Sequence, residues 1–153
     1  MELGFSPLGL GFLLALLIPN LLWTKRKPEG YEAHAVRESR RLRLLEMLGE
    51  VLVSLFAVVI PQGSWGWRGW LLLSLLGIVL YEFWWIRYFR SPRRMKDLYS
   101  SLLGIPVAGA TLPVATFFLL GLYQRNFLLL PSVVVLGIGH IGIHLGHKRE
   151  LEE

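Results

Sequence analysis

The sequence predicts an all-α polytopic membrane protein, a bundle of five transmembrane helices that forms one domain over residues 1–153. Hydrophobic residues make up 54% of the chain and gather in five long blocks, and a helix needs about 20 mostly apolar residues to cross a bilayer. The blocks contain unbroken apolar runs such as VVVL at residues 133–136. Strands of a transmembrane β-barrel alternate apolar and polar residues, so the sequence favours helices.

The five blocks predict helices over residues 7–23, 44–60, 67–89, 101–123 and 127–146. Pro7 suits the first turn of a helix, and the turn residues 61–64 end the second block. The fourth block is interrupted by residues that disfavour a helix, namely Gly104, Pro106, Gly109 and Pro113. These residues predict either a proline kink repaired by neighbouring helices or a broken helix of the kind found at transporter binding sites.

The distribution of lysine and arginine among the connections predicts how the chain is oriented in the membrane. The connection 24–43 holds seven of them, residues 87–96 hold five and the C-terminal tail holds two, whereas the other two connections hold one each. Cytoplasmic loops are enriched in Lys and Arg, so the loops 24–43 and 90–100 and the C-terminus are predicted in the cytoplasm and the N-terminus outside. The chain is therefore expected in the bacterial cytoplasmic (inner) membrane.

The two basic connections contain further predicted features. Residues 31–47 are rich in helix formers and are expected to continue directly into the second span, and a short basic helix is expected over residues 92–99. Aromatic residues at membrane interfaces form belts. Such a belt is predicted at the cytoplasmic interface from Trp23, Tyr81, Trp84, Trp85 and Tyr88.

Composition limits the partners and the chemistry. The absence of cysteine excludes disulfides, thiolate metal sites and cysteine nucleophiles. The basic residues 25–27 and 93–96 predict contact with anionic lipid at the cytoplasmic face, and no motif indicates nucleic-acid binding. Five helices make a thin wall for a pore, so a homo-oligomer is expected. Its packing surface is predicted on the last helix, at Gly139, Gly142 and Gly146.

Ionisable groups at membrane depth are costly and are therefore functional candidates. His140, His144 and His147 fall on one stripe of the last helix, since each residue turns the helix by about 100°. Glu46 and Glu50 share a face of the second helix. The remaining candidates for ligand binding near the same end are Asn20, Glu82 and Arg87.

These residue types allow three kinds of chemistry. Imidazole and carboxylate groups are ligands for a divalent transition metal such as zinc, and two histidines one turn apart, as in His140 and His144, can hold one ion, with His147 as a third ligand. Neutral histidine can instead relay protons or bind a polar ligand. The third interpretation is structural polar packing between helices.

Four stretches carry a resemblance to known proteins: IPNLLW at residues 18–23, YEFWWIRYFRS at 81–91, LGIPVAGATLP at 103–113 and GIGHIGIHL at 137–145. Together they resemble a family of small bacterial five-helix membrane proteins with no known activity. The resemblance covers nearly the whole chain. It implies the fold and implies no activity, cofactor or partner.

The sequence favours a small transporter or binding protein for a small cation or polar ligand. Its site is predicted near the cytoplasmic face between the second, third and fifth helices. There His140 and His144 would hold a cation or shuttle protons, with Glu50 and Glu82 as counter-charges. One alternative is a membrane-embedded metal-dependent enzyme that acts on a lipid, with a glutamate as general base. Another is a structural or accessory membrane subunit.

Overall fold

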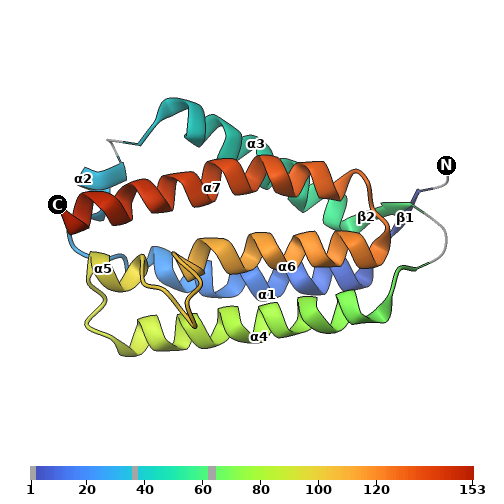
Figure 1. Ribbon diagram of the computed structural model, residues 1–153, viewed down its shortest axis with the longest axis horizontal. Helices are drawn as coiled ribbons and strands as arrows, with labels where there is room; N and C mark the ends of the chain where they lie inside the picture. Colours follow the sequence, from blue (N-terminus) through green and yellow to red (C-terminus); the bar gives the residue numbers. More distant parts are fainter. Residues whose placement is uncertain (1–2, 36–37, 62–64) are drawn as a thin grey trace.

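The computed structural model describes residues 3–35, 38–61 and 65–153, and it is an all-α bundle, as predicted. The described residues form five long helices that run lengthwise beside one another and two short helices at the end that holds the C-terminus (Figure 1). The long helices are α1 (Pro7–Thr24), α3 (Arg40–Val58), α4 (Arg68–Arg90), α6 (Ala108–Gln124) and α7 (Leu129–Glu152). The short ones are α2 (Tyr31–Ala35) and α5 (Met95–Leu98).

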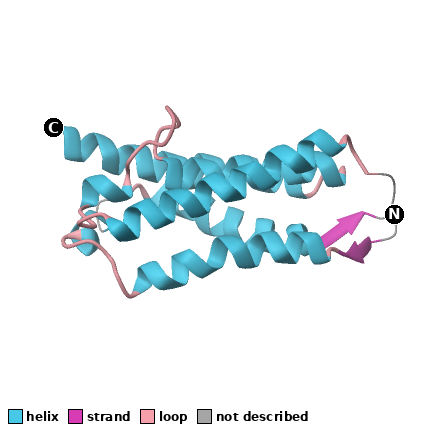
Figure 2. Ribbon diagram, turned by 90° about the horizontal axis from the view of Figure 1, so that it is seen from below, coloured by secondary structure: helices cyan, strands magenta, loops and turns pink. Residues whose placement is uncertain are grey.

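A small antiparallel pair of strands lies at the opposite end (Figure 2). Strand β1 (Leu3–Phe5) pairs with β2 (Val59–Pro61), with Gly4 opposite Ile60. The sequence did not predict this pair, because three residues are too few to show a strand pattern. The predicted turn at residues 61–64 falls mainly outside the described residues, which resume at Trp65.

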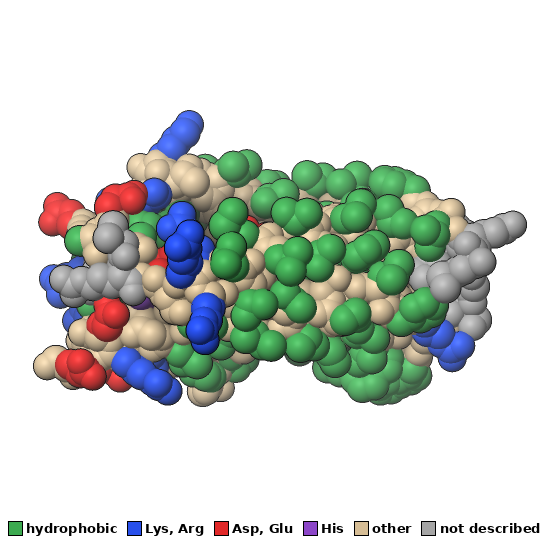
Figure 3. All heavy atoms as spheres, turned by 90° about the horizontal axis from the view of Figure 1, so that it is seen from above, with side chains coloured by type: hydrophobic (Ala, Val, Ile, Leu, Met, Phe, Trp, Pro, Cys, Tyr) green, Lys and Arg blue, Asp and Glu red, His purple; other side chains and the backbone are tan. Residues whose placement is uncertain are grey.

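Three of the long helices, α1, α4 and α7, are long and apolar enough to cross a membrane. Of the five predicted spans, therefore, three meet this criterion. Helix α6 has only 17 residues, and α3 carries several charged side chains in its first half. Figure 3 shows hydrophobic side chains covering the middle of the bundle, while most charged side chains gather at the end of the C-terminus. This surface and the three apolar helices indicate a membrane protein.

Several helix boundaries differ from those predicted. The expected continuous helix over residues 31–47 is divided, because α2 ends at Ala35 and α3 begins at Arg40 after an extended Ser39. The fourth helix begins at Ala108 instead of residue 101, since Leu103, Gly104 and Val107 have positive φ angles. The last helix continues to Glu152 because its charged tail consists of good helix formers.

Glycine allows α3 and α7 to pack closely side by side (Figure 1). A Cβ atom at Gly49 would overlap the backbone of Leu136, and one at Gly139 would lie 2.7 Å from the Leu42 carbonyl oxygen. Small residues permit such approach between helices. The predicted glycine surface of α7 is thus occupied by α3 of the same chain at Gly139 and Gly142, which corrects its assignment as a surface for another copy.

Buried polar side chains join the helices at the end of the β-strands. The fully buried Asn126 donates to the carbonyl oxygens of Phe56 and Val59 at 2.7 and 3.2 Å and accepts from the N–H of Leu129 at 3.0 Å. Gln124 donates to the Ser6 hydroxyl at 2.8 Å. These bonds satisfy buried backbone groups where α6 turns into α7.

The close contact of α3 with α7 predicts different effects for two glycine substitutions on α7. Gly139→Ala is expected to destabilise the fold by about 1–3 kcal/mol because the methyl group overlaps α3. At Gly146, no described atom would lie within 4 Å of an added Cβ, and alanine is the better helix former by about 1 kcal/mol. Thermal unfolding in detergent measures both. Equal melting temperatures for the two variants would contradict this packing.

Candidate functional site

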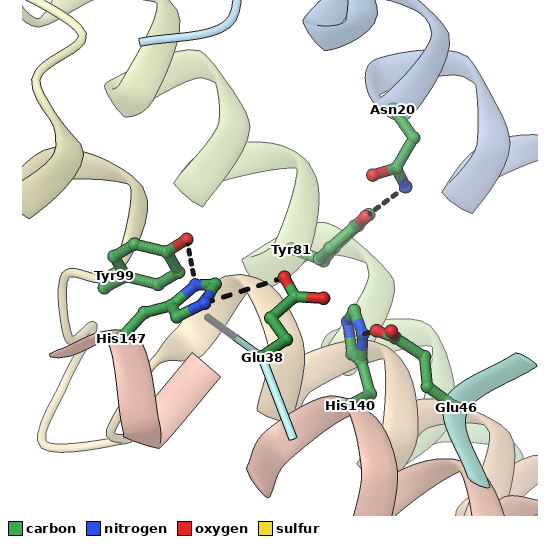
Figure 4. Close-up of polar contacts among 7 residues, drawn as sticks. All are labelled: Asn20, Glu38, Glu46, Tyr81, Tyr99, His140 and His147. Carbon is green, nitrogen blue, oxygen red and sulfur yellow. Dashed lines mark hydrogen bonds and ion pairs between the residues drawn. The ribbon is translucent and has the colours of Figure 1, made fainter. Parts of the chain in front are cut away.

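A hydrogen bond between α7 and α3 lies at the centre of the candidate site. His140 Nδ1 is 2.6 Å from Glu46 Oε1, and both side chains are about four-fifths buried (Figure 4). The His144 ring lies beside His140, with 4.5 Å between ring centroids. The close packing of the two helices at Gly139 therefore brings the predicted imidazole stripe against the predicted carboxylate face.

These side chains border a cavity of about 260 Å³ between the helices, which we call the chamber; two of its lining residues, Asn20 and Glu50, are partly exposed. Its polar lining comes from α1, α3 and α7, and its aromatic lining from α1, α2 and α4. The polar residues are Asn20, Glu46, Glu50, His140 and His144, and the aromatic residues are Trp23, Tyr31, Trp84 and Trp85. Asn20 is oriented by hydrogen bonds that its Nδ2 donates to the Tyr81 hydroxyl at 2.8 Å and the Leu16 carbonyl at 2.7 Å.

A second cavity of about 410 Å³, the mouth, lies at the charged end between α2, α3 and α7. His147 joins the elements around it. Its Nδ1 is 2.6 Å from the Tyr99 hydroxyl and its Nε2 is 3.6 Å from Glu38 Oε1 (Figure 4). Tyr99 also packs edge-on against His144, with ring centroids 5.3 Å apart. Aromatic and imidazole rings thus follow one another from the mouth to the chamber.

Carboxylates slightly outnumber cations around the mouth, since Glu32, Glu38 and Glu46 line it together with Lys27 and Arg43. Burial, followed by the charges of Glu38, Glu46 and Glu32, raises the pKa of Tyr31 to about 12. Burial, followed by the charge of Glu46, also raises the pKa of Glu38, and Arg43 opposes this. Burial is the main cause that raises the pKa of Tyr99. The mouth is partly buried and has more carboxylates than cations in its lining, so its electrostatic potential favours cations.

A third cavity of about 390 Å³, the cleft, is mostly apolar and lies between α1 and α3. Tyr81, Pro113 and Phe117 line it from the interior. Leu17 and Leu21 also line it and are 50% and 63% exposed, so the cleft opens on the apolar side of the bundle.

The chamber connects these two cavities. It shares Tyr31, Glu46 and His144 with the mouth. The chamber shares four residues with the cleft, namely Asn20, Trp23, Glu50 and His140. The three cavities are therefore direct neighbours, and the chamber lies between the mouth and the cleft.

Two predicted ligand-binding residues lie away from these cavities. Glu82 lines none of the three. Arg87 donates to the Ser100 hydroxyl at 2.7 Å and to the Ser101 carbonyl at 2.9 Å, so it fixes the loop before α6. On the same helix α4, the large buried rings of Tyr81, Trp84 and Trp85 take the inward-facing positions instead.

The structure does not assemble the predicted metal ligands around one point. Within residues 3–35, 38–61 and 65–153, no three His, Cys, Asp or Glu side chains are placed to hold a common metal ion. His140 and His144 border the chamber, whereas His147 contacts Tyr99 in the mouth. A zinc site at His140, His144 and His147 therefore remains a sequence-based hypothesis that this arrangement does not support.

Sequence reasoning missed several residues of the site. Tyr31 and Glu38 were expected in a helix that continues into the second span, and Tyr99 at the end of a short basic helix. None was named as a site residue, because helical spacing does not show that these connections fold back onto the bundle. Trp84 and Trp85 were assigned to an interfacial belt, but they are 1% and 5% exposed and lie in the interior. Their adjacent positions on a helix would have indicated that at least one of them faces away from lipid.

The raised pKa of Glu38 predicts a pH dependence. A carboxyl group whose pKa is higher in the folded protein favours folding while it is protonated, and this contribution is lost as pH rises from its ordinary pKa of 4.5 through the folded value. Glu38→Gln should therefore reduce the fall in melting temperature between pH 4.5 and neutral pH. The exposed Glu29→Gln is the control. Identical pH profiles for both variants would contradict the burial of Glu38.

Comparison with protein-family models, with curated proteins and with solved structures finds no match to this chain. The family resemblance of the four sequence stretches therefore stays a prediction. What the chain does must be inferred from its own geometry, which consists of the mouth, the chamber and the cleft, joined through the side chains that they share.

Proposed function

We propose that this protein crosses the cytoplasmic membrane five times, with its N-terminus outside, and binds a small organic cation in the chamber. Helix α3 lies along the apolar α7 and must share its depth (Figure 1). The 17 residues of α6 lie at the lower limit for a span. The Lys- and Arg-rich end, which holds the mouth, would face the cytoplasm.

The lining of the chamber is the observation that carries this proposal. Two carboxylates, Glu46 and Glu50, lie there with four aromatic rings, and none of the lining residues is Lys or Arg. Glu46 is paired with His140, whereas Glu50 has no hydrogen-bond or ion-pair partner among the described side chains. A carboxylate at membrane depth requires compensation, and aromatic faces attract cations such as ammonium groups.

The histidines give the site a second property. The Nδ1 atom of His144 is buried and has no hydrogen-bond partner in the part of the chain that the structure describes. It can accept a hydrogen bond from a protonated amine, or carry a proton between the chamber and the mouth. A cation that enters from the mouth could therefore exchange with protons. A homo-oligomer and transport across the bilayer are extensions of this proposal.

A second candidate function is an enzyme that acts on a lipid. The cleft favours it, because an opening on the apolar side would admit an acyl chain to the polar chamber. Glu50, which borders both cavities, would then be the general base. Release of a water-soluble headgroup from phospholipid vesicles by the purified protein would favour this function over binding alone.

Binding of a tetraalkylammonium ion, measured by quenching of tryptophan fluorescence, tests the proposal. Glu50→Gln should weaken binding about 10- to 100-fold, because it removes the charge that attracts the quaternary ammonium. Glu82→Gln is the matched control, since it removes a carboxylate at membrane depth outside the chamber. No saturable binding, or the same loss in both variants, would refute a cation site at Glu50.

A further inference from the structure

A separate cavity of about 680 Å³ lies at the charged end, between the connections that follow α1 and α4. We call it the basic notch. It is lined by residues 25–29 and 92–95, shares Lys27 with the mouth, and shares no residue with the chamber or the cleft. Its position is set by α1 and α4, which are held together near this end by the bond between Asn20 and Tyr81.

The notch concentrates positive charge. Its ionisable lining consists of one carboxylate, Glu29, and five cations, Lys25, Arg26, Lys27, Arg93 and Arg94. Lys27 is paired with Glu32 at 2.7 Å. Among the described residues, Lys25, Arg93 and Arg94 have no ion-pair partner. Like charges at one cavity repel one another, and an anion relieves this repulsion.

The backbone of the notch is fixed on both sides. Arg93 has a φ of 56° and donates its N–H to the Ser91 hydroxyl at 3.0 Å, and the Arg94 N–H donates to Asp97 Oδ2 at 2.8 Å. Opposite, the Arg26 N–H donates to the Trp23 carbonyl at 2.7 Å. A site whose backbone is held before binding loses less entropy when a ligand arrives.

The surroundings of the notch favour a lipid over a free anion. The notch follows directly on the ends of α1 and α4, where Trp23 and Tyr88 lie. Just before these ends, the two helices expose apolar side chains, including Leu21, Leu22, Phe83 and Ile86. A phosphate in the notch would thus have apolar protein surface directly beneath it for acyl chains.

We propose that the basic notch binds the phosphate headgroup of an anionic membrane phospholipid whose acyl chains lie along α1 and α4. The guanidinium groups of Arg93 and Arg94 would bind the phosphate oxygens. Lys25 and Arg26 would add positive charge beside the phosphate. Glu29 opposes binding. The site is independent of the chamber, so it stands even if the chamber binds no cation.

Native mass spectrometry of the full chain in detergent, titrated with phosphatidylglycerol, tests this site. The double variant Arg93→Gln/Arg94→Gln should weaken binding about 10- to 30-fold, and Glu29→Gln should strengthen it. Arg40→Gln/Arg41→Gln is the matched control, because it removes two exposed charges at the same end outside the notch. It should change the affinity less than about twofold.

Two further ligands show whether the notch binds a phospholipid or any compound that carries a phosphate. Glycerol phosphate carries the headgroup without acyl chains and should bind far more weakly than phosphatidylglycerol, and phosphatidylcholine should bind equally to all variants. Equal losses in the two double variants would overturn the proposal, because they would show diffuse surface charge. Glycerol phosphate binding as tightly as the lipid would overturn the commitment to a phospholipid.

Discussion

The close contact between α3 and α7 is the constraint on which the candidate site depends. Gly49 and Gly139 allow the two backbones to touch, and this places His140 Nδ1 2.6 Å from Glu46 Oε1. In an apolar environment neither group could be buried alone at low cost, so each depends on the other. Polar bonds between helices also fix their rotation and register. Glu50, one turn further along α3, is thereby placed beside the chamber.

The two ends of the bundle are built differently. At the end of the β-strands, Asn126 and Gln124 are buried and hydrogen-bonded to the neighbouring segments. At the other end, α2 and the loop after α1 leave room for the mouth, which is bordered by the Tyr99–His147–Glu38 contacts. The mouth therefore opens at the charged end, and the cleft opens on the apolar side of the bundle.

The sequence was sufficient for the helices and for part of the site. Long apolar blocks locate the long helices, and helical spacing places His140, His144, Glu46 and Glu50 on two faces. Which faces meet depends on tertiary packing, which periodicity does not encode. Glu82 illustrates the limit, since it shares a helix with the chamber residues Trp84 and Trp85 but lines none of the three cavities. Glu38 and Tyr99 lie in connections that the sequence predicted to be helical, and helical spacing did not indicate that both side chains contact His147.

We propose that the chamber, which Glu46 and Glu50 line, admits cations from the Lys- and Arg-rich end. The chain has no cysteine, so a single Leu98→Cys substitution introduces one thiol at a buried residue that lines the chamber but neither the mouth nor the cleft. Its rate of modification can be compared for cationic and anionic thiosulfonates of equal size, applied to each side of oriented vesicles. We expect the cationic reagent to react at least ~10-fold faster, only from the side of the mouth, and more slowly with a tetraalkylammonium ion present. Equal rates for both reagents, or reaction from the opposite side, would contradict the account.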